Sequence, residues 1–173
     1  MPALNKVALA LGSNLGDRAA NLQSALDALI DSGALGDVVV SGTYETEPVG
    51  GPEQGPYLNA VVRGNTLLTP TALLREVHRI EDQLGRVRTI HWGPRTVDID
   101  ILAYEDEVLD TEDLVIPHPR AHERAFVLMP WSEIDSEHEI GTQGTVAQCL
   151  AAVSRTGVVL REDATLHVKT GGI

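Results

Sequence analysis

Two segments of this chain carry apolar side chains at helical spacing, and they constrain the fold more than any other feature. The first segment follows a plausible N-cap at Asp17, stops at Gly33, and has on one face Ala19, Leu22, Leu26, Leu29 and Ile30. The second follows Thr69-Pro70, stops at Gly85, and has on one face Leu73, Val77, Ile80 and Leu84. An apolar stripe of this kind must be buried against another element, so we expect both helices to pack on a sheet.

Short β-rich runs lie around these helices, at residues 6–11, 37–47, 57–68 and 97–104. Residues 48–56 cannot be regular structure because they hold three prolines and three glycines. A helix near 145–154 and a strand near 158–168 would form a C-terminal extension. The order predicts an α+β fold, a ferredoxin-like β-α-β-β-α-β sandwich in which an antiparallel sheet carries its helices on one face. At this length we expect one domain over residues 1–173.

The charge distribution restricts the kind of partner. A net charge of −12 argues against nucleic acid, whose phosphates are bound by clustered Lys and Arg. Residues 85–96 are the exception, because GRVRTIHWGPRT holds three arginines and no acid. This cationic segment favours a small polyanion, with a solvated loop as the alternative. No apolar run reaches the roughly 18–20 residues of a membrane span, and Cys149 is the single cysteine, so we expect a cytoplasmic protein without a membrane partner.

Two acids interrupt the apolar pattern of the strand at 97–104. Side chains alternate along a strand, so Asp98 and Asp100 share a face about 6–7 Å apart, while Ile99 and Ile101 point the other way. Magnesium takes oxygen ligands and combines one or two carboxylates with water and substrate phosphates. Spacing alone fits a magnesium site and an exposed sheet face with two solvated acids equally well.

The neighbouring arginines favour the metal site. Arg95 precedes Asp98 by three residues, and Arg86 and Arg88 lie shortly upstream. Carboxylates that hold a metal, beside guanidinium groups that bind phosphate oxygens, are the parts of a phosphoryl-transfer site. No GxxxxGK[ST] loop occurs in the sequence, so ATP would not be bound in the P-loop manner.

Six stretches together resemble the 6-hydroxymethyl-7,8-dihydropterin pyrophosphokinase family. In the family's order they are ALALGSNL from Ala8, TEPV from Thr46, YLNA from Tyr57, GRVR from Gly85, WGPRTVDIDI from Trp92, and IPHP from Ile116 with RAF from Arg124. The resemblance covers residues 8 to about 131, and GPRTVDIDI is its most specific part. It implies diphosphate transfer from ATP, the co-substrate, to the hydroxymethyl group of the pterin, giving AMP in a step of folate biosynthesis.

The resemblance also assigns residues to roles. Asp98 and Asp100 would hold two Mg²⁺ ions, and Arg86 and Arg95 would act on the diphosphate during transfer. The pterin would lie between two aromatic rings and against polar groups, supplied by Thr46, Val49, Tyr57, Asn59, Trp92 and Phe126. The nucleotide site would comprise His78, Glu81, Arg88, Trp92, Arg95, Ile101, His118 and Arg124. Both substrates are small molecules, and we expect a monomer.

The chain departs from familiar members at three points. His78 stands where they carry glutamine, Pro119 stands where they carry an aromatic residue, and the loop between Arg88 and Trp92 is about one residue shorter. Two other functions stay open from the residues alone. A non-catalytic ferredoxin-like regulatory domain would bind a small ligand without turnover, and a γ-phosphoryl kinase would release ADP.

Overall fold

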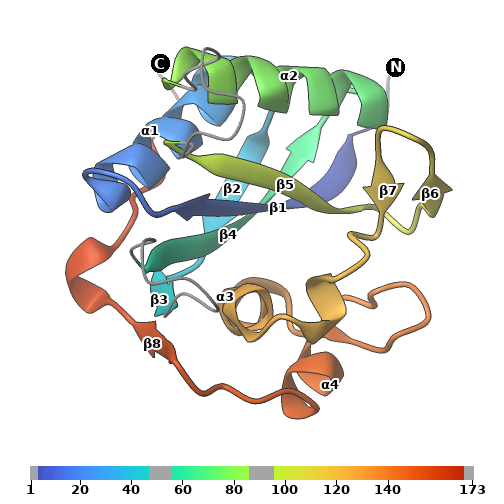
Figure 1. Cartoon of the computed structure of the whole chain (residues 1–173). Coiled ribbons are helices and arrows are strands. Elements are labelled where there is room, and N and C mark those ends of the chain that lie inside the picture. Colours follow the sequence, from blue (N-terminus) through green and yellow to red (C-terminus); the bar gives the residue numbers. More distant parts are fainter. Residues whose placement is uncertain (1–3, 47–55, 86–95, 170–173) are drawn as a thin grey trace.

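Three long antiparallel strands form the centre of the sheet. The computed structural model describes residues 4–46, 56–85 and 96–169. The apolar run near the N-terminus forms β1 (Asn5–Ser13), which pairs on one side with β4 (Tyr57–Thr66) and on the other with β5 (Asp98–Tyr104). β5 is therefore an edge strand of the sheet (Figure 1). Asp98 and Asp100, in the first half of β5, thus lie at the border of the sheet.

The β-rich run predicted over residues 37–47 is divided into two strands. β2 (Gly36–Val40) and β3 (Tyr44–Thr46) both pair with β4, at opposite ends of it. The chain turns between them at Ser41, whose amide donates to Val61 O and whose hydroxyl accepts from Val61 N. This local pairing lets the chain bend without losing its hydrogen bonds to β4.

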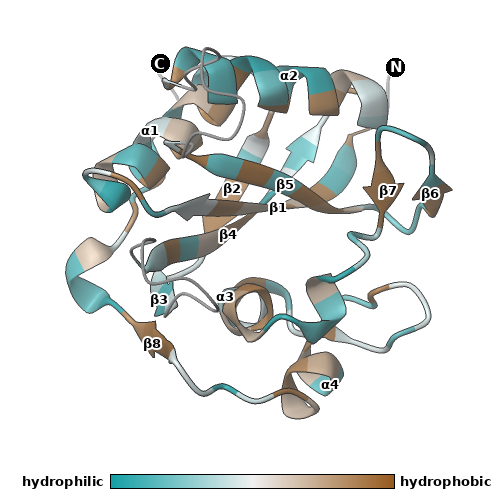
Figure 2. Cartoon of the chain, in the orientation of Figure 1, coloured by the Kyte–Doolittle hydropathy of each residue, from teal (hydrophilic) through white to brown (hydrophobic). Residues whose placement is uncertain are grey.

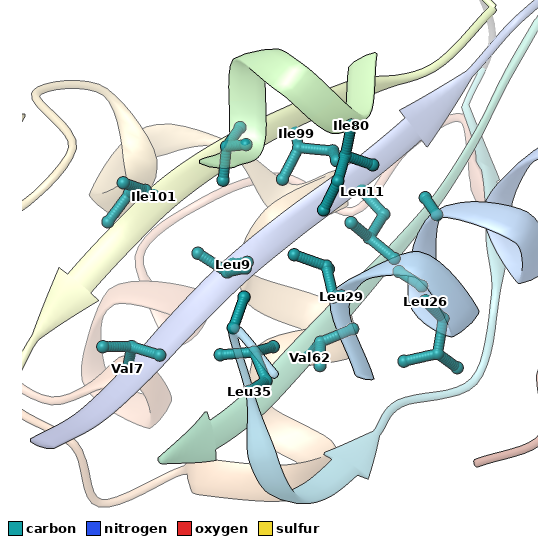
Figure 3. Close-up of a cluster of buried hydrophobic side chains, with 14 of the residues drawn as sticks. Val7, Leu9, Leu11, Leu26, Leu29, Leu35, Val62, Ile80, Ile99 and Ile101 are labelled. Carbon is teal, nitrogen blue, oxygen red and sulfur yellow. The ribbon is translucent and has the colours of Figure 1, made fainter. Parts of the chain in front are cut away.

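The two predicted helices pack on the same face of the sheet. α1 (Arg18–Asp31) begins at Asp17, whose carboxylate accepts from Ala20 N, and α2 (Pro70–Gln83) begins at Thr69, whose hydroxyl accepts from Ala72 N. Both predicted N-caps are thus confirmed. The helices cover the strand side chains that point toward them, and Figure 3 shows this core, with among others Leu9, Leu26, Leu29, Val62, Ile80, Ile99 and Ile101.

The C-terminal extension covers the other face of the sheet, with one helix that was not predicted and one that was expected near residues 145–154. It contains the short strands β6 (Leu109–Asp110) and β7 (Val115–Ile116), then α3 (Ala125–Asp135) and α4 (Val146–Ala151). Figure 1 shows α3 and α4 on the side of the sheet opposite α1 and α2, and Figure 2 shows that α3 is hydrophobic along most of its length. A second core forms there around Val61, Leu128 and Trp131. The prediction of helices on one face therefore holds only for α1 and α2.

The last predicted strand is shorter than expected. β8 (Val158–Leu160) pairs with β3 and extends the sheet to the order β5-β1-β4-β3-β8, with β2 also on β4. A 3-10 turn (Glu162–Ala164) follows, and the chain then runs past α1, where Leu166 enters the first core. The β-α-β-β-α-β unit of a ferredoxin-like α+β fold is thus present, with an extension that closes its second face. No helix in the described ranges is long and apolar enough to cross a bilayer.

A half-buried histidine that packs on the second core predicts a pH dependence of stability. The His138 ring lies against Trp131, with centroids 5.4 Å apart, and burial lowers the pKa of His138 below the usual 6.5, against the opposing effect of Asp135. The unfolded chain then binds more protons than the native one, so the free energy of unfolding should fall as the pH drops through 6.5. We expect His138→Gln to flatten this dependence in thermal denaturation between pH about 7.5 and about 5.5. An unchanged slope in the variant would contradict this assignment.

Candidate active site

A cavity of about 340 Å³ lies between the sheet and the start of α3. β1, β3, β4 and β5 contribute to its walls, and residues 124–127 close it from the α3 side. It brings together four residues predicted for the pterin and four predicted for the phosphates, metal or nucleotide, namely Thr46, Tyr57, Asn59, Phe126, Asp98, Asp100, His118 and Arg124. These residues come from five separate segments of the chain, so the fold, and not the sequence, makes them neighbours.

Small residues make room for this cavity. Three residues of β1 line the cavity, and two of them, Ala10 and Gly12, are small, whereas Val7, Leu9 and Leu11 belong to the core under α1 and α2. A Cβ on Gly12 would lie 3.0 Å from Asn59 Oδ1, so any larger residue would press on the cavity wall. Neither residue was predicted to belong to the site, although large and small side chains alternate in the sequence from Val7 to Gly12.

The two aspartates stand next to these small residues. In the register of β1 and β5, Asp98 is opposite Gly12 and Asp100 is opposite Ala10. Asp98 is half-buried, Asp100 is exposed, and both line the cavity. The carboxylates thus share one face and one opening, as the alternation of the strand predicted.

One side of the cavity is polar and two of its residues are aromatic. Asn59 Nδ2 donates to Thr46 Oγ1 at 3.0 Å, which fixes both side chains at the polar side. Tyr57 contributes its ring from β4 and Phe126 from α3, and the guanidinium of Arg124 lies 5.6 Å from the Phe126 ring centroid. Two rings on separate elements beside an ordered polar pair suit a flat heterocycle that carries hydrogen-bonding groups.

A second cavity of about 310 Å³ lies along the outer edge of β5. Its walls come from α2, from residues 99–101 of β5, and from residues 112–119, which include the turn between β6 and β7. Four residues predicted for the nucleotide line it: His78, Glu81, Ile101 and His118. Asp100 and His118 line both cavities, so the two spaces meet at these side chains.

Glu81 is bonded to the strand that carries the aspartates. Its side chain is buried, and Oε2 accepts a hydrogen bond of 2.9 Å from Ile99 N. Ile99 lies between Asp98 and Asp100, so this carboxylate holds β5 against α2 at the position of the pair. Glu81 was predicted from the sequence to belong to the nucleotide site. The structure shows in addition that its hydrogen bond to Ile99 N orients β5.

His118 is a neutral hydrogen-bond donor at the junction. Burial lowers its pKa, an effect that Arg124 and Arg120 reinforce and that nearby Asp100 opposes. Arg120 N donates to His118 Nδ1 at 3.2 Å, so the ring proton is on Nε2. A neutral imidazole with Nε2–H can donate to an anionic oxygen without adding a third positive charge beside Arg120 and Arg124.

Five predicted site residues lie outside the described residues: Val49, Arg86, Arg88, Trp92 and Arg95. Thr96, the described residue next to Arg95, is bonded to the end of β1 and to α1. Its carbonyl accepts from Ser13 Oγ at 2.7 Å and from Asn21 Nδ2 at 3.4 Å, and Asn21 also donates to Leu15 O at 2.7 Å. Ser13 and Asn21 thus hold Thr96 beside the turn that joins β1 to α1.

Comparison with known sequences points to one enzyme family. Residues 8–136 match the family described as 7,8-dihydro-6-hydroxymethylpterin-pyrophosphokinase. A 2-amino-4-hydroxy-6-hydroxymethyldihydropteridine pyrophosphokinase of Bacillus subtilis is 46% identical over 137 residues, which are 79% of this chain and 82% of the relative. The enzyme of the same name from Methylorubrum extorquens is 44% identical over 155 residues, 90% of this chain and 98% of its own.

Solved structures share the fold at low identity. The crystal structure of wild-type Plasmodium falciparum HPPK-DHPS with pteroate superposes with a TM-score of 0.70 at 15% identity over 87% of this chain. The match spans 44% of that longer chain, less than half of its length. At this identity the likeness supports the architecture, the antiparallel sheet with its helices, and nothing finer.

Proposed function

The chain belongs to the 7,8-dihydro-6-hydroxymethylpterin-pyrophosphokinase family, and we propose that its two cavities hold the two substrates of that reaction. It is a pyrophosphokinase of folate biosynthesis that uses ATP as co-substrate. Diphosphate passes from ATP to the hydroxymethyl group of 6-hydroxymethyl-7,8-dihydropterin, and AMP leaves. The observation that carries our assignment is that Asp100 and His118 line both cavities.

The first cavity suits the pterin. Tyr57 and Phe126 offer two aromatic faces, and the bonded pair Thr46 and Asn59 offers donors and acceptors to the edge of the heterocycle. Val49 and Trp92 remain proposed pterin residues from the sequence motifs. The pterin's hydroxymethyl group would then point toward Asp98 and Asp100, because Asp100 lines both cavities and Asp98 lies on the same strand face.

The second cavity suits the nucleotide. α2 and the residues after β5 enclose it, and His78, Ile101 and His118 line it. Arg124 lies in the first cavity, where its guanidinium stacks on Phe126, so it would reach the phosphates from the pterin side. Glu81 would act on the nucleotide site through its hold on Ile99.

The carboxylate pair fits two Mg²⁺ ions shared with ATP. Asp98 and Asp100 supply oxygen ligands from one strand face and leave the rest of each coordination sphere to phosphates and water, as magnesium prefers. Within residues 4–46, 56–85 and 96–169 no group of three His, Cys, Asp or Glu side chains could hold a metal without such help. Bound magnesium would neutralise phosphate charge at the transferring group.

In the proposed reaction the pterin hydroxyl oxygen attacks the β-phosphorus of ATP. A new oxygen–phosphorus bond forms, the bond between the β-phosphorus and the oxygen bridging to the α-phosphorus breaks, and the hydroxyl proton is released. His118 Nε2–H and Arg124 donate to phosphate oxygens, and the fold holds both substrates in line. Arg86 and Arg95 are proposed to bind the diphosphate during transfer, and Arg88 to approach ATP.

The function is tested by the nucleotide product. The protein is incubated with ATP, magnesium and 6-hydroxymethyl-7,8-dihydropterin, and nucleotides are separated by chromatography. We expect AMP in proportion to pterin consumed. ADP in place of AMP would indicate a γ-phosphoryl kinase, and no pterin-dependent turnover would leave a ligand-binding domain.

Filling the floor of the first cavity should weaken pterin binding. The Cβ of Gly12→Ala would displace Asn59, so we expect pterin affinity to fall about tenfold while ATP affinity stays unchanged. Calorimetry with each ligand measures both. Gly36→Ala is the matched control, since its Cβ would meet no atom within 4 Å. If Gly12→Ala and the wild type bound the pterin equally well, the pterin would have to bind outside this cavity.

Three other expectations remain predictions. They are that the 173 residues form one domain, that the protein is a monomer, and that it works in the cytoplasm. Light scattering after size-exclusion chromatography tests the monomer directly, because a dimer would have twice the mass of one 18.6 kDa chain.

A further inference from the structure

One carboxylate outside both cavities is bonded to two arginines from distant parts of the chain. Glu45 Oε2, on β3, accepts from Arg18 Nη2 at 2.8 Å and from Arg161 Nη1 at 2.7 Å. Arg18 is the first residue of α1, and Arg161 directly follows β8. All three side chains are half-buried, where charge-assisted bonds are screened less than at the open surface.

Arg18 also joins the two strands that carry the polar side of the first cavity. While Nη2 binds Glu45, Nη1 donates to Pro56 O at 2.8 Å, and Pro56 directly precedes β4. One planar guanidinium therefore connects the last part of β3 with the start of β4. Thr46 and Tyr57, which are paired across these strands, both line the cavity.

Arg161 is itself held in place by its surroundings. Its amide donates to Thr43 O at 2.8 Å, and the Thr43 hydroxyl donates to Arg161 O at 3.1 Å, so the backbone is bound on both sides. Its guanidinium makes two further bonds to Asp163, of 3.0 and 2.9 Å. The C-terminal extension thus presents a fixed positive charge to Glu45.

The position of Glu45 connects this network to the substrate. Alternation along β3 places Glu45 and Thr46 on opposite faces, so Glu45 holds the strand from behind while Thr46 faces the cavity. We propose that Glu45, Arg18 and Arg161 are positioning residues for the pterin subsite, an inference that rests on the proposed function. Through them, the C-terminal extension sets the place of Thr46 relative to Tyr57 and Asn59.

The physical reason is that β3 is only three residues long. Such a short strand has few ladder hydrogen bonds to fix it, and without Glu45 the two guanidinium groups that share its oxygen would repel each other. A displaced β3 would move the Thr46 hydroxyl away from Asn59 Nδ2 and cost affinity for the ligand that needs both. The second cavity contains no residue of β3, so ATP binding should not change.

Steady-state kinetics of Glu45→Gln, Arg161→Gln and Arg18→Gln tests the proposal. We expect each variant to raise the KM for the pterin about tenfold, with the KM for ATP and the melting temperature little changed. In the double variant of Glu45 and Arg161 the loss of pterin-binding free energy should be smaller than the sum of the losses in the two single variants, because both residues act through one interaction. Arg18→Lys should recover only part of the loss, since an ammonium does not present the fork that binds two acceptors.

Lys169→Gln is the matched control, because Lys169 also ties the C-terminal extension to α1, at Asp31, but away from β3. It should behave as the wild type. Pterin KM values within twofold of wild type in the three variants would overturn the proposal, and so would equal rises in both KM values, which would indicate a general structural role. A wild-type protein without pterin-dependent AMP formation would instead refute the proposed function itself.

Discussion

Asp98→Ala and Asp100→Ala are each expected to lower turnover by about a thousandfold without unfolding the protein. The two carboxylates share one strand face and one opening, and Asp100 stands where the cavities meet. Each variant would remove oxygen ligands that ATP phosphates alone do not replace. Loss of the Asp100 carboxylate also relieves repulsion within the pair, so the free Asp100→Ala enzyme should unfold at the same or a higher temperature.

Turnover at saturating magnesium and thermal denaturation measure the two parts of this prediction. Asp110→Ala is a suitable control, because this exposed acid belongs to β6 and lines neither cavity. Near-normal turnover of either active-site variant would show that the carboxylates are solvated acids of the sheet face and not metal ligands.

Tyr57→Ala and Phe126→Ala are expected to weaken pterin binding by about 1–3 kcal/mol each, with a much smaller effect on ATP. The rings come from β4 and α3 and line the same cavity, so each substitution removes one aromatic face of the proposed stacking site. Phe126→Ala should in addition weaken phosphate binding by Arg124, because the Arg124 guanidinium loses the ring on which it lies.

Calorimetry with each ligand alone separates these effects from packing. Equal losses for pterin and ATP would mean that the rings support the fold of the whole site. A loss of affinity for ATP alone would mean that ATP, and not the pterin, binds in the first cavity.

The parts of the fold that the sequence predicted are those with local signals. Leucines at helical spacing and the caps Asp17 and Thr69 define α1 and α2, and short apolar runs define β1 and β5. α3 has no such signal, because it is apolar on most sides and contains Pro130, so no stripe distinguishes it. That is why α3 was missed, whereas the helix expected near residues 145–154, which has a clear N-cap at Thr145, is present as α4.

The candidate site divides in the same way. Asp98 and Asp100 were found because two acids in an apolar strand are conspicuous, and Tyr57, Asn59 and Phe126 because they belong to motifs. Gly12 was missed because it contributes to the site by leaving space, and the need for that space cannot be recognised from the sequence. The bonds of Glu45 to Arg18 and Arg161 span 27 and 116 residues, and only the fold makes such partners visible.

The central claim is that pterin and ATP occupy separate cavities that meet at Asp100 and His118. A crystal structure with the pterin, magnesium and a non-hydrolysable ATP analogue tests it most directly. We predict the pterin ring between Tyr57 and Phe126, the adenosine beside α2 and residues 112–119, and the β-phosphorus near Asp100, facing the pterin hydroxyl. Both ligands in one cavity, or the phosphates bound away from Asp98 and Asp100, would contradict the account.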